Sequence, residues 1–105
     1  PNFGVMIYGG GFLDKEDTTK FREGFRVPAD APPMFFSVSH DDKNSPVEMA
    51  RLYLEYKKLG LPAELHVFAH GGHGYGMRGD PSKPAHAWTQ RCAEWMEAMG
   101  WLPKN

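Results

Sequence analysis

Residues 33–42 read PMFFSVSHDD, and residues 45–48, only three positions later, read SPVE. The apolar run Met34–Val38 shows no alternation, which is typical of a strand that is covered on both faces, and it ends in a polar cluster. Ser45, Pro46 and Glu48 then form a capping-box pattern that predicts a helix N-terminus, with Ser45 as the N-cap and Pro46 in the first helical position. A buried strand followed at once by a capped helix indicates an α/β fold.

The neighbouring segments repeat this alternation. After Gly60 and Pro62 end the helix, whose period we place on Ala50, Tyr53, Leu54 and Lys57, residues 63–69 (AELHVFA) predict another strand. A last helix is expected over 83–99, because its apolar residues recur at spacings of three and four. Upstream, residues 3–8 (FGVMIY) predict a doubly covered strand, and residues 14–30 a long loop with a helical turn near 18–23. The order β, loop, β, α, β, α favours a parallel sheet.

Composition limits the possible functions. The 105 residues suit one domain, and 12 Lys+Arg against 13 Asp+Glu gives a net charge of −1, with no electrostatic case for nucleic acid or an anionic membrane. A single cysteine, Cys92, excludes an internal disulfide and any cysteine-based zinc site, and we expect it in the core. Because the chain starts at Pro1 without Met, we expect a processed or truncated piece, whose compartment is unknown.

Two polar clusters follow predicted strands. Asp41 and Asp42 come after the strand at 34–38, and His73 lies in the glycine-rich loop after the strand at 63–69. Carboxyl ends of parallel strands share one edge of a sheet, where an acid that orients a histidine makes it a general base. The plainer interpretation is a turn-forming aspartate and an ordinary loop histidine.

Other candidate sites are less convincing. His66 and His70 flank an extended run, and four residues at about 3.3 Å each place them about 13 Å apart, too far to share a metal ion with His73. The stretch Tyr8–Phe12 (YGGGF) is similar to an oxyanion-hole loop but lacks its histidine. Ser45 already serves as a predicted cap, and the sequence contains no G-x-S-x-G, so the chain offers an acid and a base without a nucleophile.

Together, PMFFSVSHDD (33–42), SPVE (45–48), GLPAELHVF (60–68), GGHGYG (71–76) and the helix from Trp88 to Trp95 resemble the C-terminal half of an α/β-hydrolase. The similarity is strongest to acetylxylan-esterase-like and dienelactone-hydrolase-like esterases, which are related to the prolyl oligopeptidase catalytic domain. The resemblance implies that residues 1–105 supply the last three parallel strands and last two helices of an incomplete three-layer αβα fold. The nucleophile-bearing half would then be absent.

The resemblance also implies the site. It makes His73 the catalytic base and Asp41, the first of two adjacent acids, the catalytic acid, with Asp42 as the alternative; no metal or cofactor is implied. The expected function is the acid/base-bearing portion of a serine carboxylic-ester hydrolase of acetyl or xylan type, inactive alone and acting on a small ester or carbohydrate ester. Peptidase activity stays open.

The expected partner of the chain is a complementing Ser-bearing segment, or a second copy of the chain that pairs along the edge of the strand at 3–8. The alternatives are a non-catalytic truncated fragment or interaction module, and a small stand-alone α/β binding domain.

Overall fold

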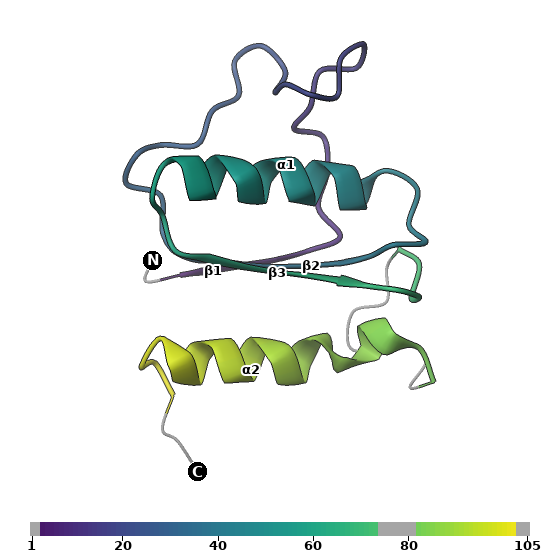
Figure 1. Ribbon diagram of the computed structural model, residues 1–105, viewed down its shortest axis with the longest axis vertical. Coiled ribbons are helices and arrows are strands. Elements are labelled where there is room, and N and C mark those ends of the chain that lie inside the picture. The colour runs from purple at the N-terminus through teal and green to yellow at the C-terminus, as the bar shows by residue number, and fades with distance from the viewer. Residues whose placement is uncertain (1–2, 74–81, 103–105) are drawn as a thin grey trace.

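The computed structural model describes residues 3–73 and 82–102, which form three layers (Figure 1). A parallel sheet lies in the middle, with α1 on one face and α2 on the other. In chain order the elements are β1 (Gly4–Ile7), β2 (Met34–Ser39), α1 (Ser45–Lys58), β3 (Ala63–Phe68), a 3₁₀ turn (Pro84–Ala87) and α2 (Trp88–Ala98). The predicted αβα architecture is therefore present, with boundaries moved by a few residues.

Strand β2 is the centre of the sheet, whose order is β1-β2-β3. Phe36 lies opposite Met6 of β1 and Leu65 of β3, and both pairings are parallel. All residues of β2 after the first are buried, because each face of this strand is covered by a helix. This confirms the interpretation of the unalternated run.

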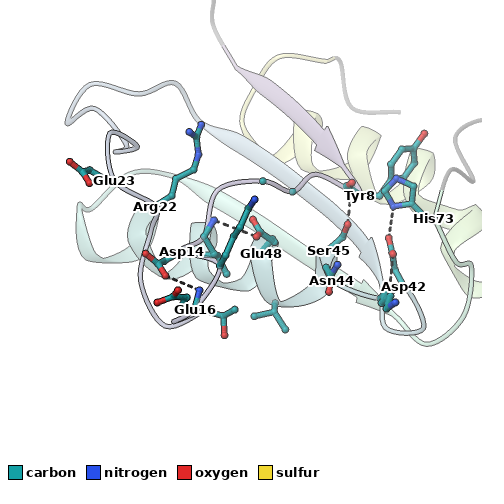
Figure 2. Close-up of a pocket in the computed structure, with 17 residues that line it drawn as sticks. Tyr8, Asp14, Glu16, Arg22, Glu23, Asp42, Asn44, Ser45, Glu48 and His73 are labelled. Carbon is teal, nitrogen blue, oxygen red and sulfur yellow. Dashed lines mark hydrogen bonds and ion pairs between the residues drawn. The ribbon is translucent and has the colours of Figure 1, made fainter.

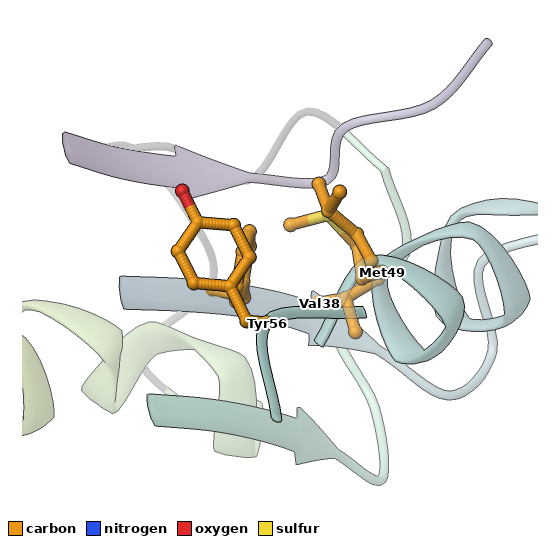
Figure 3. Close-up of a cluster of buried hydrophobic side chains, with 5 residues drawn as sticks. Val38, Met49 and Tyr56 are labelled. Atoms are coloured by element: carbon orange, nitrogen blue, oxygen red, sulfur yellow. The ribbon is translucent and has the colours of Figure 1, made fainter. Parts of the chain in front are cut away.

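Helix α1 packs on β2 with a different face from the one that the sequence predicted. Its buried residues include Met49, Leu52 and Tyr56, whereas Leu54 is 52% exposed. Met49 and Tyr56 meet Val38 in the cluster of Figure 3. The expected period through Ala50, Tyr53, Leu54 and Lys57 was wrong because this helix carries apolar residues on more than one face, so the 3.6-residue period alone does not fix which face is buried.

The predicted capping box is also wrong. Helix α1 begins at Ser45, and its N-cap, Asn44, makes no side-chain capping bond. The Ser45 hydroxyl donates instead to the Tyr8 carbonyl oxygen (3.3 Å), and the Glu48 carboxylate accepts from the backbone N–H groups of Phe12 (2.7 Å) and Leu13 (3.3 Å). Both polar groups therefore satisfy the segment after β1 rather than the helix itself.

On the opposite face, α2 presents the predicted apolar stripe. Cys92 and Trp95 are buried against Phe35 of β2, with Trp88, Met96 and Met99 packed around them. Burial and, to a lesser degree, the charge of Glu64 raise the pKa of the Cys92 thiol, which matches its expected place in the core. Within residues 3–73 and 82–102, neither helix is long and apolar enough to cross a membrane.

The chain before β2 differs most from expectation. Strand β1 has only four residues and is half-exposed rather than doubly covered, with Val5 39% exposed. The segment between β1 and β2 forms no helix near 18–23, although single hydrogen-bonded turns occur at Asp17–Lys20 and Arg22–Phe25. The segment also contains a short antiparallel bridge between Leu13 and Phe21, and the rings of Phe12 and Phe21 contact that of Phe25 and pack against the core cluster under α1. Aromatic clustering replaces periodic secondary structure in this segment.

Candidate active site

Three loops meet at the carboxyl edge of the sheet. Tyr8 follows β1, Asp41 and Asp42 follow β2, and His73 lies beyond β3. All three strands are parallel, so their carboxyl ends share one edge, where open α/β sheets bind their ligands. The topology therefore brings the two predicted polar clusters to the same side of the molecule.

A side-chain contact between these clusters joins Asp42 to His73. Asp42 Oδ2 lies 2.7 Å from His73 Nδ1 (Figure 2), and the backbone N–H of Lys43 donates to Asp42 Oδ1 at 2.7 Å. The Asp42 side chain is only 8% exposed, whereas that of His73 is 59% exposed. A nearly buried carboxylate that holds Nδ1 fixes the tautomer and leaves Nε2 as the nitrogen that can accept a proton.

Asp41 has different partners. Its Oδ1 accepts from the Ser39 hydroxyl (2.5 Å) and the Gly72 N–H (2.7 Å), and the Gly71 N–H lies 3.2 Å away. His70 Nδ1 lies 3.6 Å from its Oδ2. The Ser39 hydroxyl above all, and then the Gly72 N–H, hold the pKa of Asp41 far below its usual range. Asp41 is thus an ionised anchor for the backbone that leads to His73.

The expected pairing of Asp41 with His73 therefore needs correction, because Asp42, the alternative acid, holds the imidazole. The cause is the tight turn after β2, in which the Asp42 N–H donates to the Ser39 carbonyl at 3.1 Å. This turn sends two adjacent side chains to different partners. The sequence motifs could show only that one of these two aspartates is the expected partner of His73.

The loop that carries His73 also contacts the 3₁₀ turn. The Ala85 N–H donates to the His70 carbonyl at 3.1 Å, and a Cβ added to Gly71 would collide with Ala85 Cβ. Only glycine allows this approach of the loop to the 3₁₀ turn. Gly74, Tyr75 and Gly76, which carry part of the quoted motif, lie outside the described residues.

Tyr8 is a component of the site that the sequence did not identify. Its ring centroid lies 4.7 Å from that of His73, at an interplanar angle of 55°. The sequence drew attention to Tyr8 only as the start of a glycine-rich stretch, and no periodicity or motif there indicates a contact with a loop 65 positions away.

A cavity of about 1010 Å³ opens beside the pair. Asp42, His73 and Tyr8 line one end, and side chains from the segment after β1, among them Asp14 and Arg22, line the other (Figure 2). Most of the residues that line it are charged or polar, although their apolar atoms make up the larger part of its surface. The imidazole therefore borders a space large enough for a small-molecule substrate.

The serines at positions 37, 39 and 45 are buried, and two of them have hydrogen-bond partners other than the imidazole. Ser37 and Ser39 are fully buried and Ser45 nearly so, and the hydroxyls of Ser39 and Ser45 donate to Asp41 and Tyr8. Within the described residues, His, Cys, Asp and Glu form no group of three that could hold a metal ion. The described site thus contains an imidazole whose Nδ1 atom is held by a nearly buried carboxylate.

Comparison with known proteins places this geometry in a wider context. No protein-family profile and no curated protein matches the chain. Among solved structures, an acetyl ester-xyloside bifunctional hydrolase from Caldicellulosiruptor lactoaceticus matches with a TM-score of 0.76 and 26% identity, over 98% of this chain and 44% of its own.

Two further structures agree. An α/β hydrolase from a Medee basin deep-sea metagenome library has a TM-score of 0.76 and 20% identity, over 97% of this chain and 46% of its own. A thermophilic esterase from Thermogutta terrifontis, solved with butyrate, has a TM-score of 0.66 and 19% identity, over 99% and 46%. The chain spans less than half the length of these structures. Over nearly all of its own length, the chain is a structural match to α/β-hydrolase esterases and has a partial α/β-hydrolase fold.

Proposed function

We propose that the chain is the acid/base-bearing, C-terminal portion of a serine carboxylic-ester hydrolase. One observation carries this proposal: the 2.7 Å contact between the nearly buried Asp42 carboxylate and the Nδ1 atom of a solvent-facing His73, beside a cavity. A histidine arranged in this way is poised for general-base catalysis. The similarity to α/β-hydrolase esterases supports this chemistry over a purely structural ion pair.

In the proposed reaction, a serine from a segment outside this chain attacks the ester carbonyl while His73 Nε2 takes its hydroxyl proton. The tetrahedral intermediate collapses, the carbon–oxygen bond to the alcohol breaks, and His73 returns the proton to the departing alkoxide. Water then attacks the acyl-serine by the same route and releases the acid. Asp42 stabilises the imidazolium that forms in each half of the reaction.

We propose an ester of a small acid, such as acetate, as the substrate class. The similar structure from Caldicellulosiruptor is named as an acetyl ester-xyloside hydrolase. The polar side chains at the cavity, including Asp14, Arg22 and Asn44, offer hydrogen-bond partners to an alcohol part that carries hydroxyl groups, as in a carbohydrate ester.

The proposed partner is the Ser-bearing segment itself, paired along the free edge of β1. Within the described residues, β1 pairs only with β2, and its Val5 is 39% exposed. An apolar strand with an unpaired edge favours the addition of another strand. A second copy of the chain would use the same edge. Light scattering on the chain alone shows whether it self-associates. A monomer that melts cooperatively would contradict both the need for a Ser-bearing segment and the self-association.

The experiment that tests the function combines the chain with a Ser-bearing segment and measures hydrolysis of p-nitrophenyl acetate. His73→Ala should abolish the activity, whereas His40→Ala, a change of an exposed histidine near the same edge, should not. Full activity of His73→Ala would remove the assignment. If a fluorophosphonate probe labels no serine of the assembly, the non-catalytic alternative, an interaction module, is correct instead.

A further inference from the structure

Tyr8, whose ring contacts His73, has an unfavourable backbone conformation. Its φ is +41°, and it is the one residue other than glycine with positive φ in the described ranges 3–73 and 82–102. A bulky side chain is strained in this region. Gly9, Gly10 and Gly11 follow at once and would adopt this conformation freely, yet the strained position holds a tyrosine. Such strain persists where the surrounding structure imposes it, often at functional sites.

The surrounding structure fixes the Tyr8 backbone from both sides. Its N–H donates to the Ser37 carbonyl (2.8 Å) in the sheet, and its carbonyl accepts from the nearly buried Ser45 hydroxyl (3.3 Å). This second bond explains why Ser45 does not cap α1. The hydroxyl that the sequence assigns to the helix is used to hold the strained turn.

The side chain that results from this turn contacts the imidazole. The two ring centroids are 4.7 Å apart with a tilt of 55°, which is a favourable aromatic geometry. Asp42 holds the same imidazole through Nδ1, so His73 has one contact from the end of β1 and one from the end of β2 (Figure 2). With its side chain 59% exposed, His73 has few other restraints.

We propose that Tyr8 is a positioning residue, whose ring restricts rotation of the His73 imidazole so that Asp42 can hold Nδ1 and Nε2 faces the cavity. The catalytic meaning of this restraint rests on the proposed esterase function. The restraint itself is a property of the chain and is measured without activity.

The test is an NMR comparison of the imidazole signals of the ¹⁵N-labelled full chain with those of Tyr8→Leu, Tyr8→Phe and a control. Tyr8→Leu should shift the His73 ring protons downfield through loss of the ring current, and should reduce the fraction of the tautomer with the proton on Nδ1. Tyr8→Phe should restore both signals. Tyr53→Leu removes a half-buried ring of α1 that packs against the core cluster around Leu52, and it should leave His73 unchanged.

Two results would overturn the proposal: a Tyr8→Leu variant whose His73 signals match those of the wild type, or a wild-type chain without nuclear Overhauser contacts between the Tyr8 and His73 rings. The second measurement needs no variant and stands even if Tyr8→Leu fails to fold. Tyr8→Gly gives a further check, since it should melt no lower than Tyr8→Leu while its His73 also loses the fixed tautomer. If the wild-type assembly has no esterase activity although the contact between the Tyr8 and His73 rings is present, the proposed function is wrong and the positioning role of Tyr8 is unaffected.

Discussion

The assignment of the acid is tested most directly by Asp42→Asn. In the wild type, a carboxylate oxygen lies 2.7 Å from His73 Nδ1 and accepts a hydrogen bond from its N–H. An asparagine can turn its NH₂ group toward Nδ1, which favours the tautomer with the proton on Nε2. That tautomer cannot accept the serine proton. The same exchange in a Ser-His-Asp triad lowers kcat about 10⁴-fold, equivalent to about 5 kcal/mol in the activation barrier.

Asp41→Asn is the matched control, because it makes the same chemical change one residue away. The amide that replaces this carboxylate keeps an oxygen that can accept from Ser39 and Gly72, so the loop should stay near its wild-type position. We therefore expect a loss in kcat of less than about tenfold, below the roughly 10²–10⁴-fold that a group acting directly in proton transfer contributes.

The assay is p-nitrophenyl acetate hydrolysis by each variant combined with the Ser-bearing segment, with circular dichroism as a check on folding. Saturation curves separate kcat from KM. If Asp41→Asn loses more activity than Asp42→Asn while both variants remain folded, then the acid is Asp41, and the contact in this structure does not represent the active arrangement.

Three further predictions concern the support of the site. Glu48→Ala leaves two backbone N–H groups without their acceptor and should lower the stability by about 2 kcal/mol, which is about 8–16 °C in Tm for a domain of this size by thermal melting. The pKa of Asp41 is lowered in the folded state. Its contribution to the free energy of unfolding is therefore complete at a pH above the ordinary pKa of about 3.9, and it is lost as the pH falls through the lower pKa of the folded state. The difference in urea midpoint between wild type and Asp41→Asn should therefore shrink at strongly acidic pH, and a constant difference would contradict the assignment. Gly71→Ala should destabilise more than Gly72→Ala in urea titrations, because its Cβ would collide with Ala85, while Gly72 has φ +66° but open space.

Much of the fold follows from local patterns in the sequence. The period of α2 was predicted correctly because Cys92 and Trp95 belong to a single apolar stripe that has only one core to face. The order of strands and helices, and the meeting of acid and base at one edge, follow from parallel topology.

The errors arise where a tertiary contact competes with a local one. Ser45 and Glu48 have the spacing of a capping box, but the segment after β1 lies against α1 and offers backbone groups that need partners. A buried N–H or carbonyl without a partner is costly, whereas the first turn of an exposed helix can be satisfied by water. No local pattern shows that this segment will lie there, so the sequence alone favours the cap.

The pairing of His73 with Asp42 rather than Asp41 is likewise decided by tertiary contacts, and it has a functional consequence. Two adjacent aspartates are chemically identical, and their environments alone distinguish them. Asp41 is engaged by Ser39 and the loop amides, which keep it ionised and fixed to the backbone before His73. Asp42 is nearly buried and bonded to the imidazole. One acid therefore fixes the loop and the other fixes the ring. If His73 is the base that we propose, it needs both restraints, since proton transfer requires its ring nitrogen within about 3 Å of the nucleophile.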